Sequence, residues 1–240
     1  MGRRKHDAPL DLFSTGEVAT GCGLSTRNVM YLCGEGLIPI ASGGEGKGRH
    51  RELEFEGLAQ AAVIGAFYSA GIEIYLASRL MQEIGEETSF HDLTNLERFL
   101  SGPHSGVVAT MREENLDPEN ALHLHDALRR WSNNYQPQKG MAFDKLIEIF
   151  DRIFVFLNHL SPQDDRATLG PSDTPVAMYR ISGWQKGTNK VELVPAPAHR
   201  TRRLPPDWRR ARENFRGMTR VNVSLAIRDS LDAIAGARGA

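Results

Sequence analysis

The most distinctive chemical groups of the sequence are four consecutive hydrogen-bonding side chains, Ser25-Thr26-Arg27-Asn28. They fall in the first turn of a short predicted helix, for which Ser25 is a suitable N-cap. An arginine can hold the edge of a guanine base through two hydrogen bonds, and an asparagine can hold adenine in the same way. This chemistry is typical of reading bases in the major groove of DNA, whereas Ser25 and Thr26 are better suited to a phosphate contact or a helix cap.

A second set of side chains is placed to contact a DNA backbone. Tyr31, further along the same helix, offers a phenolic hydroxyl to a phosphate, and a glycine-rich segment after it carries a basic cluster: Lys47, Arg49, His50 and Arg51. Positive side chains bind duplex DNA by neutralising phosphates and releasing counterions. The basic stretch Arg3-Arg4-Lys5 could extend that contact. The alternative interpretation is that all of these are ordinary solvated surface charges.

The remaining reactive side chains form no constellation typical of an enzyme. Cys22 and Cys33 are the only two cysteines, and two thiols alone do not make a zinc or mercury site, so we interpret them as small core residues. His123 and His125 stand two residues apart on a predicted helix, where side chains diverge. The sequence has no Gly-x-Ser-x-Gly nucleophile elbow. We therefore expect no catalytic residues, no metal, no cofactor and no enzymatic activity.

Two short helices separated by a glycine turn are expected to position the first group of side chains. Ser14-Thr15-Gly16-Glu17 has the pattern of a capping box and predicts a helix from Glu17 to about Cys22. Gly23-Leu24-Ser25 then predicts a tight turn, and a second helix follows over Thr26–Cys33. This is the helix-turn-helix unit. Its expected core residues are Val18, Ala19, Leu24, Val29 and Leu37.

A β-hairpin wing is expected after the second helix. Leu37–Ile40 is an apolar strand candidate, and it is followed by a glycine-rich tip and by the basic return strand that ends near Arg51. The tip lacks the Gly-Lys-Ser/Thr ending of a nucleotide-binding loop. Two further helices are predicted over Glu56–Ser69 and Ile74–Gln82, and Ala70-Gly71 separates them.

The middle of the chain is expected to be helical and to contribute a dimer contact. Residues 85–135 are acidic, and the strongest start signal there is Asp117-Pro118-Glu119, from which a helix should run to about Tyr135. A spacing of 3-4-3-4-3 then predicts an a/d face on a helix over 143–160, formed by Phe143, Leu146, Phe150, Ile153, Leu157 and Leu160. This helix is interpreted as a central core helix, as a dimer interface, or as both.

The C-terminal part is expected to combine strands and helices. Residues 176–182 and 190–194 predict a hairpin, Asp207–Phe215 a short helix, and the region after Arg220 a strand followed by a helix into Ala235. The arginine-rich run between Arg200 and Arg220 is interpreted as a surface strip that balances the acidic helices. Its alternative role is a second nucleic-acid contact or an anion site for an effector.

The composition places the chain among ordinary globular proteins. It has 240 residues, of which 40% are hydrophobic and 25% charged, with a net charge of −1, so DNA binding must depend on local charge. The expected fold class is mainly α with small β elements. The expected division is a basic tail (1–10), a DNA-binding domain (11–84), a helical connector with the candidate dimer contact (85–162) and a small α+β region (163–240). With no signal peptide or membrane span, we expect a cytoplasmic protein.

The segment from Phe13 to about Met81 resembles the MerR family of bacterial winged helix-turn-helix regulators. The resemblance is carried by Gly16-Glu17-Val18-Ala19, by Gly23-Leu24-Ser25, by Gly36-Leu37-Ile38-Pro39, by the wing strand Arg49-His50-Arg51-Glu52-Leu53 and by the turn Ala70-Gly71-Ile72. The family usually has Leu-Arg-Tyr-Tyr-Glu where this chain has Val29-Met30-Tyr31-Leu32-Cys33. Met30 therefore replaces an arginine that grips a phosphate, and Arg27 could partly substitute for it.

The resemblance implies a homodimer that binds double-stranded DNA at a pseudo-palindromic promoter site and distorts it. It also implies an effector or protein partner, which the sequence does not identify. Trp131, Tyr135, Tyr179 and Trp184 are aromatic side chains that could line an effector pocket. Two other hypotheses stay open. One is an interaction or adaptor protein with a repurposed helix-turn-helix that binds DNA weakly and without specificity. The other is a DNA-architecture protein of phage or plasmid type.

Overall fold

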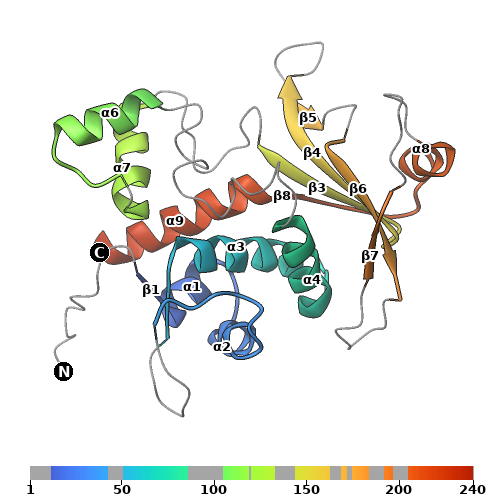
Figure 1. Cartoon of the computed structure of the whole chain (residues 1–240), viewed down its shortest axis with the longest axis horizontal. Coiled ribbons are helices and arrows are strands. Elements are labelled where there is room, and N and C mark those ends of the chain that lie inside the picture. The colour runs from blue at the N-terminus through green and yellow to red at the C-terminus, as the bar shows by residue number, and fades with distance from the viewer. Residues whose placement is uncertain are drawn as a thin grey trace.

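The computed structural model shows a mixed α/β protein (Figure 1). The residues that it describes are 12–42, 51–85, 105–118, 120–132, 144–162, 169–171, 175–183, 192–196 and 205–239. The helices of these residues are α1 (Thr15–Gly21), α2 (Thr26–Gly34), α3 (Phe55–Ser69), α4 (Ile74–Gly85), α6 (Ser105–Glu113), α7 (Ala121–Trp131), α8 (Pro206–Glu213) and α9 (Val223–Gly239). The strands are β1 (Phe13–Ser14), β2 (Glu52–Leu53), β3 (Lys145–Phe150), β4 (Phe154–Pro162), β5 (Leu169–Pro171), β6 (Ala177–Ser182), β7 (Glu192–Pro195) and β8 (Met218–Asn222). The β content exceeds the small elements expected, and no helix in the described ranges is both long and apolar enough to span a membrane.

The first two helices form as their sequence signals predict. The capping box at the start of α1 is present, since the Ser14 hydroxyl accepts from the Glu17 N–H at 3.3 Å and Glu17 accepts from the Ser14 N–H at 2.8 Å. Gly23 takes a left-handed φ of +64° in the turn, a conformation that favours glycine. Ser25 caps α2 by accepting from the Asn28 N–H at 3.1 Å. Of the expected core residues, Leu37 is half-buried and the other four are buried, namely Val18, Ala19, Leu24 and Val29.

The prediction of a hairpin strand over Leu37–Ile40 is wrong. This segment lies flat against the start of α3, where a Cβ on Gly57 would come within 2.6 Å of the Pro39 carbonyl oxygen. This close packing, together with the missing N–H of Pro39, prevents the segment from forming the backbone hydrogen bonds of a β-ladder. The partner of β2 is instead β1, with Phe13 opposite Leu53, and Ser42 only bridges to Glu52. The tip of the predicted wing, residues 43–50, lies outside the described residues.

The α3 helix is the centre of the helical core. Ten of its residues are buried, and both the predicted helix pair and its turn are present as α3, Gly71 and α4. The approach of α1 is extremely close, because a Cβ on Gly65 would lie 2.1 Å from the Cys22 carbonyl oxygen. Cys22 and Cys33 are buried free thiols. Burial raises the pKa of Cys22 to about 12, which makes this thiol unreactive.

The helix predicted over 143–160 is also wrong, because this stretch forms the antiparallel hairpin of β3 and β4. Both faces of these strands are covered, so apolar residues follow each other without the period of a half-buried strand. The turn residues give no sequence signal of a hairpin either. Asp151 and Arg152 adopt φ values of +51° and +57°, at positions where glycine or asparagine is usual.

With the helix absent, the residues expected on its a/d face do not share a surface. Leu146 and Phe150 lie on one face of β3, whereas Leu157 is paired with Ile147 on the opposite face. Leu146, Phe150 and Leu157 are at most 2% exposed within the chain. Ile153 is exposed in the turn, Leu160 is half-buried, and Phe143 lies outside the described residues. These residues therefore do not form the shared helix face that was expected as a dimer contact.

The sheet joins the hairpin to the C-terminal elements. Its strand order is β7-β6-β4-β3-β8, with β5 paired to β4, and the predicted elements β6, β7, α8, β8 and α9 are all present. One face contributes Ile147, Val155 and Val221 to the core that also contains α9 and α3. The other face packs Phe150 and Phe156 against Trp208 of α8. In Figure 1, α9 runs between the N-terminal helices and the α6–α7 pair.

A buried ion pair fastens the sheet to α9. Arg228 of α9 donates to both carboxylate oxygens of Asp144, at 2.7 Å each, and both side chains are only 5% exposed. The Asn222 amide donates to the same carboxylate at 2.9 Å. Next to it, the Lys145 N–H donates to the Ser224 hydroxyl at 2.9 Å. The start of β3 is thus tied to the first two turns of α9.

The α7 helix docks on α9 through a histidine. The helix begins after Asn120, whose side chain caps it, and not at the predicted start near Pro118. His125 is fully buried, with its Nε2 atom 3.3 Å from Asp232 of α9, and Arg129 donates to the same carboxylate at 2.8 Å. Burial lowers the pKa of His125, and the neighbouring Asp232 and Asp126 only partly offset that effect, while Arg129 adds to it.

We expect this docking to weaken in acid. The folded protein favours the neutral form of His125, because the pKa of this residue lies below its ordinary value of 6.5. The stability that depends on neutral His125 is therefore fully present above pH 6.5. The free energy of unfolding should then fall by up to about 1.4 kcal/mol per pH unit below it. Denaturant unfolding between pH 7.5 and 5.0 would measure this slope. The slope should be smaller in His125→Gln, and an equal slope in both proteins would assign the effect to another group.

Candidate nucleic-acid interface

The first turn of α2 presents the side chains that the sequence singled out. Ser25, Thr26 and Arg27 are exposed and Asn28 is half-buried, while the opposite side of the helix buries Val29, Leu32 and Cys33 in the core. The Ser25 hydroxyl is occupied as the helix cap. Arg27 is the only charged residue of α2, so it adds to the positive end of the helix dipole. This turn therefore offers a guanidinium, an amide and a hydroxyl from one rigid element.

Tyr31 and Met30 lie further along the exposed side of α2. Tyr31 is half-buried, and its ring meets the edge of the Tyr75 ring of α4 at a centroid distance of 5.5 Å. Burial and a side-chain hydrogen bond with Tyr75 raise the pKa of Tyr31 to about 12. A neutral tyrosine hydroxyl is a group that can donate to a phosphate. Met30 is 51% exposed and leaves an apolar spot between the polar groups.

Of the predicted wing residues, the structure places only Arg51. Its guanidinium turns toward α2 and donates to the Met30 carbonyl oxygen at 3.0 Å, which supports the C-terminal part of that helix. Burial raises the pKa of the Cys33 thiol, and the nearby Arg51 guanidinium partly offsets that rise. Arg51 thus joins the segment before β2 to α2 and remains partly exposed. Lys47, Arg49 and His50 lie outside the described residues.

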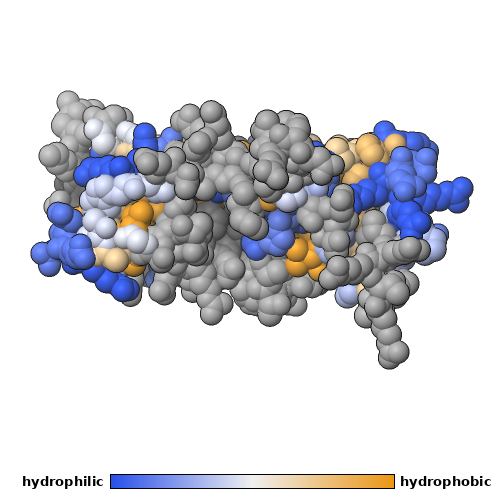
Figure 2. Space-filling model, turned by 90° about the horizontal axis from the view of Figure 1, so that it is seen from above, coloured by the Kyte–Doolittle hydropathy of each residue, from blue (hydrophilic) through white to orange (hydrophobic). Residues whose placement is uncertain are grey.

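The arginine-rich run has a partly structural role. Arg220 donates to the buried carboxylate of Glu148 at 2.7 and 3.0 Å, and Arg212 lies 3.9 Å from it. Figure 2 shows strongly hydrophilic side chains gathered at the end of the molecule where α8 lies, on the right in both views. Arg212 and Arg220 therefore neutralise a buried carboxylate of the sheet. Neither sequence interpretation, the surface strip or the nucleic-acid or anion contact, included this role.

A cleft of about 430 Å³ is lined by residues of α8, β4 and β6. The α8 helix lies well away from α2 (Figure 1). The apolar walls of the cleft are Trp208 and Phe154, whose rings meet at 4.9 Å, and its charged walls include Arg180 and Arg210. Two of the aromatic residues proposed from the sequence do not line it, since Tyr179 is buried in the core and Trp131 lies on α7. Tyr135 and Trp184 lie outside the described residues. The covering of the sheet by Trp208 had no local sequence signal.

In the part of the chain that the structure describes, no group of three or more histidine, cysteine, aspartate and glutamate side chains is arranged to hold a metal ion. His123 and His125 point to different surroundings, since His125 contacts Asp232 while the Nδ1 atom of His123 is buried without a hydrogen bond. The two cysteines lie apart as free thiols.

Comparison with known proteins adds no further assignment. No family model matches the chain, and no characterised protein has significant sequence similarity to it.

Proposed function

We propose that the chain is a sequence-specific DNA-binding transcription regulator in which α1 and α2 are the helix-turn-helix. The observation that carries the proposal is the first turn of α2, where Arg27 is exposed and Asn28 half-exposed on a helix whose other side is buried. The MerR-like pattern of residues 13–81 supports the same function. Of the residues available at a protein surface, arginine and asparagine are the types best suited to distinguish bases.

In this proposal the N-terminal end of α2 enters the major groove. Arg27 holds a guanine and Asn28 an adenine, while Thr26 and the Tyr31 hydroxyl contact phosphates. A twofold dimer in the cytoplasm presents two such helices to a pseudo-palindromic promoter site. Regulation comes from an effector or protein partner that acts on the C-terminal region.

Arg27→Ala should remove one base preference and weaken binding to the preferred site by about 1–3 kcal/mol. The measurement is selection of bound sequences from a random duplex library by the full-length protein at near-physiological salt, followed by competition with single-base variants. Arg130→Ala is the matched control, because Arg130 is an exposed arginine of α7 that pairs with Asp126, remote from α2. Equal preferences in wild type and Arg27→Ala would remove Arg27 from the interface.

A second candidate function is an interaction or adaptor protein that uses the same helices. It is favoured by the half-exposed Met30 in the middle of the α2 surface and by Arg51, which turns toward α2. The selection experiment separates the two functions. If no sequence is enriched and binding falls by orders of magnitude between low and moderate salt, the adaptor function becomes the better one.

A further inference from the structure

The α9 helix lies directly against α1. A Cβ on Gly21 of α1 would lie 2.9 Å from Cγ1 of Ile234 and 3.0 Å from the Ser230 carbonyl oxygen, so the two helices touch at their backbones. Ile227, Leu231 and Ile234 are at most 1% exposed. The helix that follows the sheet is therefore part of the same core as the proposed helix-turn-helix.

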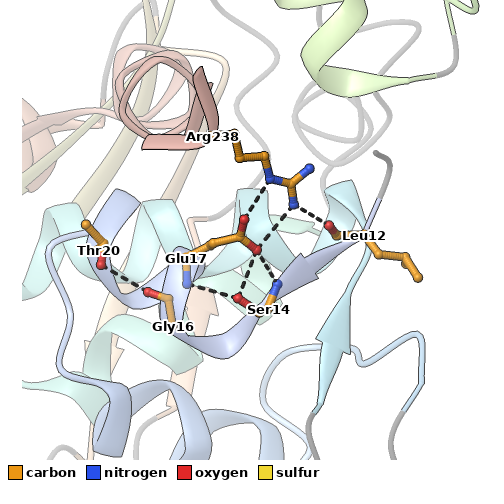
Figure 3. Close-up of polar contacts among 6 residues, drawn as sticks. All are labelled: Leu12, Ser14, Gly16, Glu17, Thr20 and Arg238. Carbon is orange, nitrogen blue, oxygen red and sulfur yellow. Dashed lines mark hydrogen bonds and ion pairs between the residues drawn. The ribbon is translucent and has the colours of Figure 1, made fainter. Parts of the chain in front are cut away.

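A single arginine at the end of α9 holds the start of α1 (Figure 3). Arg238 donates to the two carboxylate oxygens of Glu17 at 2.7 and 3.2 Å and to the Leu12 carbonyl oxygen at 2.6 Å. Its guanidinium lies 5.3 Å from the centre of the Phe13 ring. The Arg238 and Glu17 side chains are only 20% and 28% exposed, so solvent screens this pair less than a surface pair.

The carboxylate that Arg238 holds is the one that caps α1. Oε2 of Glu17 accepts from both the Ser14 N–H and the Ser14 hydroxyl at 2.8 Å. Burial alone would raise the pKa of Glu17, but Arg238 and Ser14 lower it below its ordinary value, so the carboxylate is charged at neutral pH. Arg238 therefore fixes the first turn of α1 and, through Leu12, the strand that precedes it.

We infer that Arg238 is a positioning residue for the proposed DNA interface, and that it acts through Glu17 and α1 on the orientation of α2. This inference rests on the proposed function. Only residues 22–25 separate α1 from α2, and the Leu24 N–H is bonded to the Ala19 carbonyl oxygen at 3.0 Å, so a tilt of α1 moves α2 with it. At the other end, β8 runs into α9 without a loop, and Asp144 holds Arg228. A rearrangement of the sheet thus reaches α2 along one helix.

The test compares full-length wild type, Arg238→Ala and Arg238→Lys. One readout is affinity for the duplex enriched in the selection experiment, and the other is amide hydrogen exchange, which reports local opening. Arg238→Ala should bind about 10-fold more weakly and exchange faster over residues 12–34, with unchanged exchange in β3 and β4. Arg238→Lys should be intermediate, because an ammonium cannot make the forked contact.

Arg130→Ala is the matched control, since it breaks an arginine–carboxylate pair of similar length, 2.6 Å, on the exposed side of α7. It should change neither readout. Unchanged affinity and exchange in Arg238→Ala would overturn the inference, and so would faster exchange spread evenly over the whole protein. If the wild type selects no sequence, the proposed function fails by itself, and exchange over residues 12–34 alone decides whether Arg238 holds α1.

Discussion

Asp144→Ala should destabilise the protein by about 3–5 kcal/mol, because it leaves the buried guanidinium of Arg228 without its carboxylate. The pair is bidentate, with both side chains 5% exposed, and the Asn222 amide loses its acceptor at the same time. Since Asp144 precedes β3 and Arg228 lies in α9, the loss acts on the junction between the sheet and the helical core. Urea unfolding at pH 7, followed by circular dichroism, would measure the change.

Two further variants identify the cause of that loss. Asp126→Ala removes the carboxylate of an exposed pair with Arg130, whose side chains are 53% and 65% exposed, and should cost less than about 1 kcal/mol. The double variant Asp144→Leu with Arg228→Met removes both charges and should recover much of the stability, as replacement of buried ion pairs by apolar residues often does. Equal small losses in Asp144→Ala and Asp126→Ala would mean that the Asp144 pair is solvated.

Among the glycines that the structure describes, Gly65 should tolerate replacement by alanine least. The new Cβ would lie 2.1 Å from the Cys22 carbonyl oxygen, and a backbone atom cannot turn away as a side chain can. Separating α3 from α1 should cost at least about 2 kcal/mol of unfolding free energy even after the gain in helix propensity. Thermal unfolding of the purified variant would show this as a lower midpoint.

Gly236→Ala is the matched control for Gly65→Ala. Gly236 also lies within a helix, α9, but its added Cβ would meet no atom within 4 Å. This variant should keep or increase stability by up to about 1 kcal/mol, because alanine is the better helix former. A Gly65→Ala protein as stable as wild type would contradict the close approach of α1 and α3.

The parts of the fold that the sequence predicted correctly are those with local signals. Ser14 with Glu17 and Ser25 before Thr26 are caps, and each satisfies N–H groups within its own turn. The C-terminal hairpin and β8 were likewise predicted from turn residues and alternation, and α8 and α9 were expected as helices, with the boundary between β8 and α9 left ambiguous. Such signals depend on neighbours in the chain, so no knowledge of the tertiary structure was needed.

The hairpin of β3 and β4 shows where that reasoning failed. An a/d spacing and a strand covered on both faces both produce a dense apolar run, and periodicity alone cannot separate them. The turn at Asp151 and Arg152 lacks glycine, and its Asp151 side chain is held instead by the N–H groups of Arg216 and Gly217 at 2.8 and 2.9 Å. That support comes from residues 65 and 66 positions away, which local reasoning cannot see.

The candidate site was predicted in part for the same reason. Ser25 to Asn28 follow from a helix start, so their placement on one exposed turn was accessible from the sequence. The contact of Arg51 with the Met30 carbonyl oxygen spans 21 residues, and that of Arg238 with Glu17 spans 221. Both depend on how helices pack, and neither arginine carries a local mark that distinguishes it from a solvated one.

The position of α9 against α1 also determines when the core can form during synthesis. The two contacting ends are 221 residues apart, and ribosomes add about 5–20 residues per second. The apolar side of α1 that α9 covers is therefore open for roughly 10 to 45 seconds in each nascent chain. During that interval α3, which precedes α9 in the chain and shares the core with α1, can cover only part of that side. A ribosome that stalls before α9 would leave the apolar side of α1 exposed in a chain prone to aggregation.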